Sequence, residues 1–173
     1  IYYTSVGRNS NLLLNVPPDR TGRINANDSI RLMEFRKARE ESFSKDLIEG
    51  AEIKASNVRD NSAQYSVANM LDDNYNTYWS TDDSELNPSI EIDLKQAKTF
   101  NRLALQEYIP LGQRVRSFNI ELEQGGKWIP AQTVDSTTTV GYKRIVRFQT
   151  EKAEKIRINF TDARGPLCIN NVE

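Results

Sequence analysis

The strongest constraint in the sequence is a strict alternation of polar and apolar residues, which runs from Ser89 to Leu94 as Ser-Ile-Glu-Ile-Asp-Leu. Successive side chains of a β-strand point to opposite faces, so this pattern predicts a strand with one buried face and one wet face. Turn residues, without helices, separate further strand-like runs at residues 100–108, 115–123, 127–134, 144–148, 155–160 and 168–172. The glycines of Gln124-Gly125-Gly126-Lys127 suit a hairpin. Together these features predict a mainly β protein, with an antiparallel β-sandwich over residues 49–173.

The segment before residue 49 has a different pattern. Residues 11–16, Asn-Leu-Leu-Leu-Asn-Val, form a short apolar run typical of a strand buried on both faces, as in a parallel sheet. The Thr21-Gly22-Arg23 sequence predicts a turn, and Asn27-Asp28-Ser29 offers side chains for a helix N-cap. The next apolar residues are spaced for the buried face of a helix: Ile30, Leu32, Met33 and Phe35. One strand and one helix cannot form a domain, so we interpret residues 1–48 as the end of a larger unit.

Composition and charge exclude several classes of function. Basic and acidic residues number 23 and 24, so the chain has no electrostatic footprint for nucleic acid. No apolar run approaches the roughly 20 residues of a membrane span. The chain has no histidine, which removes the commonest general base and the usual zinc ligands, and its single cysteine excludes an intrachain disulfide. Because the chain begins at Ile1 within an extended pattern, we interpret it as a fragment or processed product.

Residues 68–80, Ala-Asn-Met-Leu-Asp-Asp-Asn-Tyr-Asn-Thr-Tyr-Trp-Ser, include a loop rich in oxygen ligands. Calcium takes about six to eight oxygens, and a tight loop carrying Asp72, Asn74 and Thr77 can supply side chains and intervening carbonyl groups. Asp73 is a substitute ligand. We therefore predict a structural calcium ion as the cofactor. The alternative is an Asx-rich turn whose side chains bond to their own backbone.

The same stretch resembles the signature of discoidin, or coagulation factor C-type, domains and of family 32 carbohydrate-binding modules. In that signature a short apolar segment leads into Asp-x-Asp/Asn-x-x-Thr-x-Trp, and the later strand ending in Asp93-Leu94 also fits. The resemblance covers residues 51–173. It implies a jelly-roll β-sandwich of the galactose-binding-like kind, with Trp79 in its core. It also implies that a glutamate near the end of the chain, here Glu173, completes the calcium site.

A second resemblance lies in residues 5–22, Ser-Val-Gly-Arg-Asn-Ser-Asn-Leu-Leu-Leu-Asn-Val-Pro-Pro-Asp-Arg-Thr-Gly. They are similar to the last barrel strand and loop of glycoside hydrolase family 29, the α-L-fucosidases. The Val-Gly-Arg-Asn-Ser form, followed by a helix with Arg31-Leu32-Met33-Glu34-Phe35, is closest to the branch that cleaves α-1,3/1,4-linked fucose. Residues 112–115 and 141–144 look like segments of the sandwich domains that follow such barrels. The resemblance implies that residues 1–48 are a strand-loop-helix remnant of a (β/α) barrel, including a linker helix.

Enzymatic activity is not expected of this chain alone. The resemblance implies a retaining parent enzyme whose two carboxylates, an aspartate nucleophile and a glutamate acid/base, lie about 5–5.5 Å apart. Both lie upstream of the segment seen here, so we assign no catalytic residue. The pairs Asp72-Asp73 and Asp82-Asp83 are adjacent in sequence and would point to opposite sides of an extended chain. We expect the parent protein to be secreted, in the periplasm or outside the cell.

Candidate sugar-binding residues fall in loops at one end of the predicted sandwich. Glycan modules combine an aromatic face with a few hydrogen-bonding side chains, and the candidates here are Tyr108, Arg114, Asp82 and Arg164. The partner would be a fucosylated or galactosylated glycan, although the absence of histidine departs from many galactose-binding members. The alternative is an accessory domain without a sugar site, whose partner is the catalytic barrel of the same protein.

Two other arrangements are compatible with the sequence. The chain could be a freestanding lectin-like or adhesion module with no enzyme attached. The apolar run at residues 12–14 argues against this, because a freestanding module has no parallel sheet for it to join. Alternatively, the chain could be a fragment that stays bound noncovalently to the catalytic part after a loop is cut.

Overall fold

The computed structural model describes residues 1–173. They divide into two compact units, one of residues 1–10 with residues 47–173 and one of residues 11–46. The first unit contains the sandwich, and the first ten residues pack with it although the sequence pattern divides the chain after residue 48. The first ten residues join the sandwich because Gly7 and Asn9 form hydrogen bonds with residues 142, 143 and 145, which are distant in sequence. The origin of residues 1–48 in a barrel stays a prediction.

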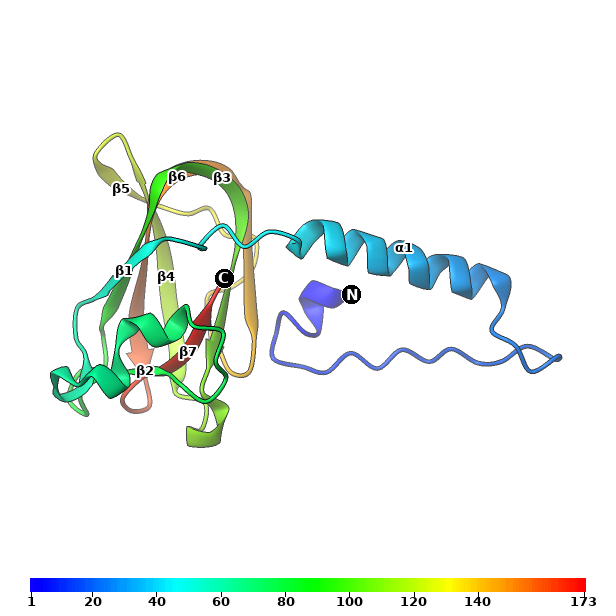
Figure 1. The fold of residues 1–173 in the computed structure, drawn as a ribbon, viewed down its shortest axis with the longest axis horizontal. Helices are drawn as coiled ribbons and strands as arrows, with labels where there is room; N and C mark the ends of the chain where they lie inside the picture. Colours follow the sequence, from blue (N-terminus) through cyan, green and yellow to red (C-terminus); the bar gives the residue numbers. More distant parts are fainter. The chain divides into compact units, whose positions relative to one another are not determined.

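Antiparallel strands form the sandwich (Figure 1). Their bounds are β1 Glu52–Ala55, β2 Trp79–Ser80, β3 Ser89–Glu107, β4 Val115–Gln124, β5 Lys127–Pro130, β6 Arg144–Ala163 and β7 Cys168–Val172. The strand order is β2-β7-β3-β6-β4-β5, and β1 pairs with β3 outside this path. Every pairing is antiparallel, as the alternating pattern predicts.

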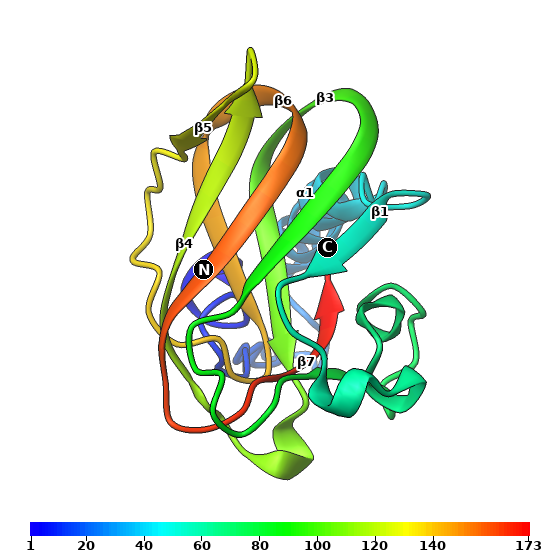
Figure 2. The same cartoon turned by 90° about the vertical axis from the view of Figure 1, so that its left-hand side faces the viewer.

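The two long strands, β3 and β6, give the sheet its two layers. The first part of β3 pairs with β1 and with residues 155–159 of β6, whereas its last part pairs with residues 144–147 of β6 and with β7. A register shift between Asp93 and Lys98, with a φ of 64° at Lys95, marks the point where β3 changes layer. Figure 2 shows both strands arching over the same end of the sandwich. The predicted jelly-roll sandwich is therefore confirmed.

The hydrophobic core lies between the layers. Ile90, Ile92 and Leu94 of β3 are buried, and the polar residues between them are only half-buried, so the alternation in the sequence follows the two faces of the strand. Trp79 is fully buried and packs against Phe160, with 6.2 Å between ring centroids. Trp79 is therefore a core residue and not a platform for sugar.

The sequence predicts most strands but not their continuity. The runs at residues 144–148 and 155–160 both lie in β6, and the run at residues 100–108 falls in the second half of β3 except for its last residue. The predicted hairpin is confirmed, because Gln124 pairs with Lys127 and both intervening glycines have positive φ, 60° at Gly125 and 79° at Gly126. Strands β1 and β2 are absent from the prediction because they are short, with four and two residues.

Short 3-10 helices lie before α1, between β1 and β2, and between β3 and β4. Their bounds are η1 Tyr2–Thr4, η2 Arg59–Asn61, η3 Ala63–Tyr65, η4 Val67–Met70 and η5 Ile109–Leu111. Two of them begin with serine caps, Ser62 for η3 and Ser66 for η4. Met70, at the end of η4, is fully buried. It ties the segment before Trp79 to the core.

The unit of residues 11–46 contains one helix, α1 Ala26–Phe43. Its N-cap is Asn25, whose Oδ1 accepts a hydrogen bond of 2.9 Å from the backbone N–H of Asn27, so the predicted cap at residues 27–29 is wrong by two residues. None of its residues is buried, and the predicted apolar face is open, with Ile30 54% and Met33 61% exposed. No helix of the chain combines the length and apolar character needed to cross a membrane.

The predicted buried strand at residues 11–16 does not form in this structure. These residues have no regular secondary structure, and Leu13 is 95% exposed. A strand needs a neighbour to satisfy its backbone N–H and C=O groups, and residues 11–46 contain none for it. The predicted turn is present, since Pro18 forms an antiparallel bridge with Ile24 and Gly22 has a φ of 78°.

Candidate glycan-binding loops and metal loop

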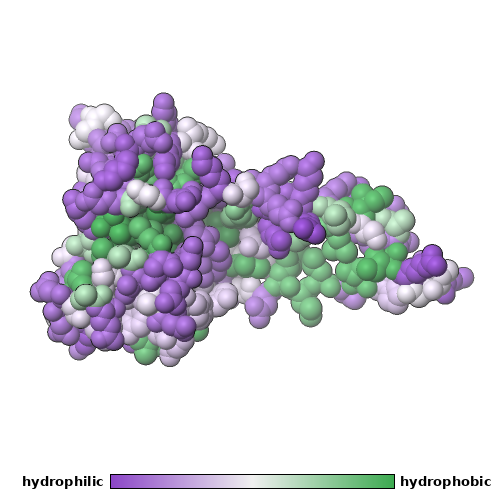
Figure 3. All heavy atoms as spheres, in the orientation of Figure 1, coloured by the Kyte–Doolittle hydropathy of each residue, from purple (hydrophilic) through white to green (hydrophobic).

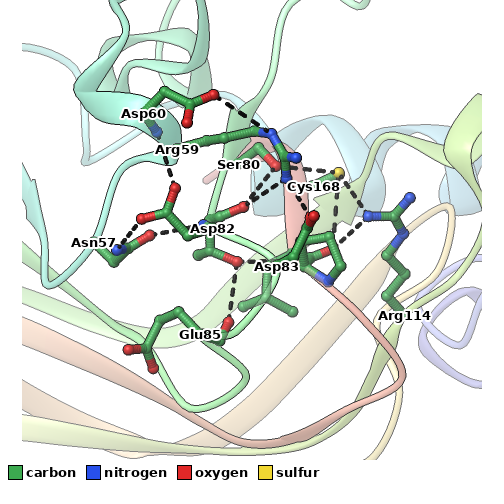
Figure 4. A network of polar contacts seen from close by, with 12 residues as sticks. Asn57, Arg59, Asp60, Ser80, Asp82, Asp83, Glu85, Arg114 and Cys168 are labelled. Atoms are coloured by element: carbon green, nitrogen blue, oxygen red, sulfur yellow. Dashed lines mark hydrogen bonds and ion pairs between the residues drawn. The ribbon is translucent and has the colours of Figure 1, made fainter.

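Four loops meet at one end of the sandwich, and they contain all four predicted sugar-binding residues. They follow β1, β2, β3 and β6, and hydrogen bonds join Asn57 to Asp82, and Arg114 to Pro166. The backbone N–H of Tyr108 also donates to the carbonyl oxygen of Cys168 at 2.8 Å. Figure 4 shows the resulting network of polar side chains. The structure therefore brings the predicted loops together, and the side-chain contacts decide which groups are free to bind a ligand.

The carboxylate of Asp82 forms hydrogen bonds that join the loop after β2 to the loop after β1. Its Oδ2 accepts a hydrogen bond from the side chain of Asn57 at 2.8 Å, and its Oδ1 accepts one from the backbone N–H of Asp60 at 2.9 Å. The bond from Asn57, followed by that from Asp60, lowers the pKa of the Asp82 carboxyl. Asp82 therefore braces the loop after β1, and a ligand would have to compete with these internal partners.

Arg59 and Asp83 form an exposed ion pair beside Asp82. The Nη1 atom of Arg59 lies 2.6 Å from Oδ1 of Asp83 and 3.2 Å from the carbonyl oxygen of Thr81. The side chain of Asp83 is 76% exposed. Asp82 and Asp83 thus bond to different partners, and their exclusion as a catalytic pair stays a prediction. Sequence patterns do not single out Arg59, because its partner is 24 residues away.

Arg114 is half-buried, and its guanidinium group contacts residues of the loop between β6 and β7 and the start of β7. Its Nη1 donates to the carbonyl oxygen of Pro166 at 2.6 Å and approaches Sγ of Cys168 at 3.4 Å. Its backbone N–H donates to Oε1 of the buried Glu107 at 2.7 Å. Burial raises the pKa of the Cys168 thiol, which stays protonated beside this guanidinium group. Arg114 therefore stabilises the loop through its side chain and its backbone.

Tyr108 belongs to a row of three tyrosines. Its ring stacks on that of Tyr78, with 4.5 Å between centroids and 14° between planes, and Tyr78 contacts Tyr65 at 5.7 Å. All three residues are half-buried. Burial raises the pKa of Tyr78. Tyr65 and Tyr78 are absent from the sequence prediction, although Tyr78 could be found from the alternation that puts its neighbour Trp79 into the core.

Arg164 is the predicted sugar-binding residue with an exposed side chain. Its backbone N–H donates to the carbonyl oxygen of Arg114 at 2.9 Å, which fixes the loop between β6 and β7 against the loop after β3. The side chain of Arg164 is thus exposed, whereas those of Asp82 and Arg114 form hydrogen bonds within the loops.

The predicted metal loop brings three oxygen ligands together. The hydroxyl group of Thr77 donates to Oδ2 of Asp72 at 2.7 Å and lies 2.9 Å from the carbonyl oxygen of Asn74. Both distances are hydrogen-bond lengths, and the three oxygens are of the kind that a hard cation prefers as ligands. The same loop also shows the predicted Asx turns, since Asp72 accepts from the backbone N–H of Asn74 and Asn74 accepts from that of Asn76.

Glu173 has other partners. Its carboxylate accepts hydrogen bonds from Nζ of Lys143 at 3.2 Å and from Nε2 of Gln106 at 3.3 Å. The chain contains no group of three or more histidine, cysteine, aspartate or glutamate side chains placed to hold a metal ion. Glu173 is thus paired with Lys143 and Gln106 in this structure, and the calcium site of Asp72, Asn74, Thr77 and Glu173 stays a prediction.

A shallow open groove of about 460 Å³ lies elsewhere, where β3 and β6 bend. Its lining includes Ala97, Gly125 and Glu151–Glu154 and none of the predicted sugar-binding residues.

Sequence comparison identifies the sandwich. The family model described as F5/8 type C domain matches residues 52–172, which cover the strands from β1 to β7. This chain belongs to the F5/8 type C domain family. The match confirms the discoidin-type resemblance that the Asp72–Trp79 motif indicates.

Relatives that match both the F5/8 type C domain and the segment before it include α-L-fucosidases. Alpha-L-fucosidase 1 of Arabidopsis thaliana is 38% identical over 151 residues, which are 86% of this chain and 29% of the plant protein. A family 29 glycoside hydrolase fucosidase of Ruminococcus gnavus, solved in complex with fucose, is 33% identical with a TM-score of 0.88. That alignment covers 99% of this chain and 34% of the bacterial one. The chain thus spans about a third of the length of these relatives.

A separate binding module shares the fold of the F5/8 type C domain. The chitosan-binding module 1 of a Paenibacillus chitosanase/glucanase has a TM-score of 0.63 and 19% identity. The alignment covers 96% of that module but 74% of this chain. This likeness concerns the fold alone.

Proposed function

We propose that this chain is the C-terminal accessory region of a secreted α-L-fucosidase and braces its catalytic part. The observation that carries the proposal is the extent of the similarity. The fucosidase structure matches 99% of the chain, including residues 11–46, whereas the chitosan-binding module matches 74%. A freestanding lectin-like or adhesion module, the alternative, would not account for the match to the preceding segment.

The exposed apolar side chains of residues 11–46 support a bracing role. Leu13, Ile24, Ile30 and Met33 are between 52% and 95% exposed. Figure 3 shows hydrophobic residues gathered along this segment. Exposed apolar surface of this extent marks a site of packing, because its removal from water is favourable by about 25 cal/mol per Å². The catalytic part would supply the covering surface.

The proposed parent enzyme hydrolyses α-1,3/1,4-linked fucose with retention. Its aspartate nucleophile and glutamate acid/base would belong to the catalytic part, and no residue of this chain is assigned to either role. Two measurements test the proposal. Mass spectrometry should give a single species near 19.8 kDa, and this purified chain should not hydrolyse an aryl α-L-fucoside.

The chain extended by its upstream sequence should hydrolyse the same substrate. An inactive extended protein would contradict the assignment to a fucosidase. Hydrolysis by the isolated chain, without a larger polypeptide in the preparation, would contradict the placement of both catalytic carboxylates outside it.

Glycan binding at the loop end is a second candidate function, which the row of tyrosines favours. Aromatic faces bind the apolar faces of sugars, and Arg164 provides exposed hydrogen-bond donors beside Arg114. Titration with fucosylated and galactosylated oligosaccharides tests it. Tyr108→Ala and Arg164→Ala should each abolish binding, whereas Arg116→Ala, which removes an exposed pair with Asp162, should not. Binding that survives both substitutions would refute this site.

A further inference from the structure

The first ten residues cover an edge of the sheet. Residues 144–147 of β6 pair with β3 on one side, and on the other side Arg8 forms an antiparallel bridge with Arg144. The backbone N–H of Ile145 donates to the carbonyl oxygen of Gly7, and that of Asn9 donates to the carbonyl oxygen of Lys143, both at 2.9 Å. Residues 7–9 therefore bind by strand addition, a recognition mode in which backbone hydrogen bonds supply the contact.

A buried carboxylate fixes the same segment through its side chains. Asp135 accepts hydrogen bonds from Arg147 at 2.9 Å and from Arg8 at 2.8 Å, and its side chain is 4% exposed. Tyr3 accepts a hydrogen bond from Arg102 at 2.6 Å, and the Arg147 guanidinium lies 4.9 Å from the centroid of its ring. We call these contacts of residues 3–9 the clasp.

Two glycines permit the close approach within the clasp. A Cβ atom at Gly7 would lie 2.8 Å from the carbonyl oxygen of Tyr3 and 3.1 Å from Cβ of Ile145. A Cβ atom at Gly141, whose φ is 66°, would overlap the side chain of Asn9. The N-terminal segment thus has a glycine, Gly7, where it approaches β6, and the sandwich has a glycine, Gly141, where Asn9 approaches it. A larger residue at either position would push the segment and the sandwich apart.

An exposed aromatic pair continues the clasp. Tyr75 and Tyr142 are 46% and 52% exposed, with 6.3 Å between their ring centroids. The backbone N–H of Tyr142 donates to Oδ1 of Asn9, so this pair lies directly beside the segment held by the clasp. Adjacent exposed aromatic side chains are enriched at protein–protein contacts.

We propose that the clasp and the Tyr75–Tyr142 pair form the surface on which the upstream part of the same protein docks. The argument is continuity, because the clasp already holds the segment that precedes residue 11 and the tyrosines extend that interface. That the docked part is a fucosidase catalytic domain rests on the proposed function. The competing occupant of the two tyrosines is a sugar.

The clasp is tested in the 173-residue chain by amide hydrogen exchange. Arg8→Ala and Tyr3→Ala should each accelerate exchange at Asn9 and Ile145 by about tenfold or more, because opening of the segment needs no global unfolding. Amides of the β3–β6 ladder should keep their rates. Asp162→Asn, which removes an exposed pair with Arg116, is the control and should change neither set. Unchanged exchange at Asn9 and Ile145 in both variants would overturn the clasp.

The docking surface is tested in the chain extended by its upstream sequence. Tyr75→Ala combined with Tyr142→Ala should lower the melting temperature of the extended protein by at least about 2 °C. The same change should leave the melting temperature of the 173-residue chain unaltered, because both side chains are exposed there. Leu111→Ala, which truncates a side chain that is 44% exposed in η5, is the control and should have no effect on either protein.

The outcomes distinguish the docking surface from the proposed function as part of a fucosidase. A lower melting temperature in an extended protein that hydrolyses no fucoside supports the docking surface and refutes the proposed function. An unchanged melting temperature in the extended protein overturns the docking surface. If the double variant then also loses affinity for an oligosaccharide, the sugar is the occupant.

Discussion

Trp79 is fully buried against Phe160, and its indole N–H donates to the carbonyl oxygen of Asn57 at 2.9 Å. Trp79→Ala should lower the free energy of unfolding by about 3–5 kcal/mol, because it leaves a cavity in the core. Urea unfolding followed by circular dichroism measures this. Trp128 is the control, since it is half-buried and its ring centroid lies 3.9 Å from Cζ of Arg157. Trp128→Ala should lower the free energy of unfolding by about 1 kcal/mol. Equal losses would contradict a core role for Trp79.

Asp135 should make stability depend on pH. The hydrogen bond from Arg147, with that from Arg8, holds the pKa of this carboxyl below its ordinary value of 3.8. A lowered pKa means that the carboxylate stabilises the fold above pH 3.8, and that this contribution is lost as the pH falls further. Asp135→Asn should therefore be less stable than the native chain at pH 7, with a difference that shrinks below pH 4. A difference that is constant from pH 7 to pH 3, measured by urea unfolding, would contradict this.

At the scale of elements, Glu107 connects three segments at the end of β3. Its carboxylate accepts hydrogen bonds from the backbone N–H groups of Arg114, Val115 and Gly141 at 2.6–2.9 Å. Burial raises its pKa, and these three bonds oppose that shift. Glu107→Gln replaces one carboxylate oxygen with an amide NH₂ group, which would face a backbone N–H donor. The free energy of unfolding should therefore fall by about 1–3 kcal/mol.

The control for that prediction is Glu91→Gln. Glu91 bonds to Arg157 on a partly exposed face of β3, so its substitution should cost less than about 1 kcal/mol. Thermal unfolding of both variants measures the difference. A smaller loss for Glu107→Gln than for Glu91→Gln would show that the buried carboxylate does not connect the loops.

We propose that the Asp72–Thr77 loop holds a structural calcium ion. The convergence of oxygens from Asp72, Asn74 and Thr77 supports this proposal. Chelation should lower the melting temperature, re-addition of calcium should restore it, and magnesium should restore it less well because it demands a tighter octahedral shell. Asp72→Asn should lose the response. A melting temperature of the native chain that does not change on chelation would contradict the calcium site and favour the alternative, an Asx-rich turn.

For the whole molecule, the two units should differ in local stability. Helix α1 has no buried residue, and its ion pairs at i,i+3 and i,i+4 are exposed, so its amides should exchange far faster than those of the β3–β6 ladder. Hydrogen exchange resolved by residue measures this in the isolated chain. Addition of the upstream part should slow exchange in α1. Protection in α1 equal to that in β3 without that part would contradict the need for a covering surface.

The sequence by itself determined the sandwich, because alternation along a strand is a local pattern that directly reflects its two faces. The motif around Trp79 determined the family for the same reason, since its spacing is contained in one loop and one short strand. The turn at Gly125-Gly126 was also predictable, because positive φ is a local property of glycine.

Only the tertiary structure decided which polar groups are free. Asp82 and Arg114 are good sugar-binding candidates by type, yet Asn57 and Pro166 engage their side chains across 25 and 52 residues. The same holds for residues 1–10, which join the sandwich through β6 and Asp135, far away in sequence. The apolar run at residues 11–16 has the composition of a buried strand but no partner strand. Partners distant in sequence leave no local pattern, so packing and hydrogen bonding had to settle these points.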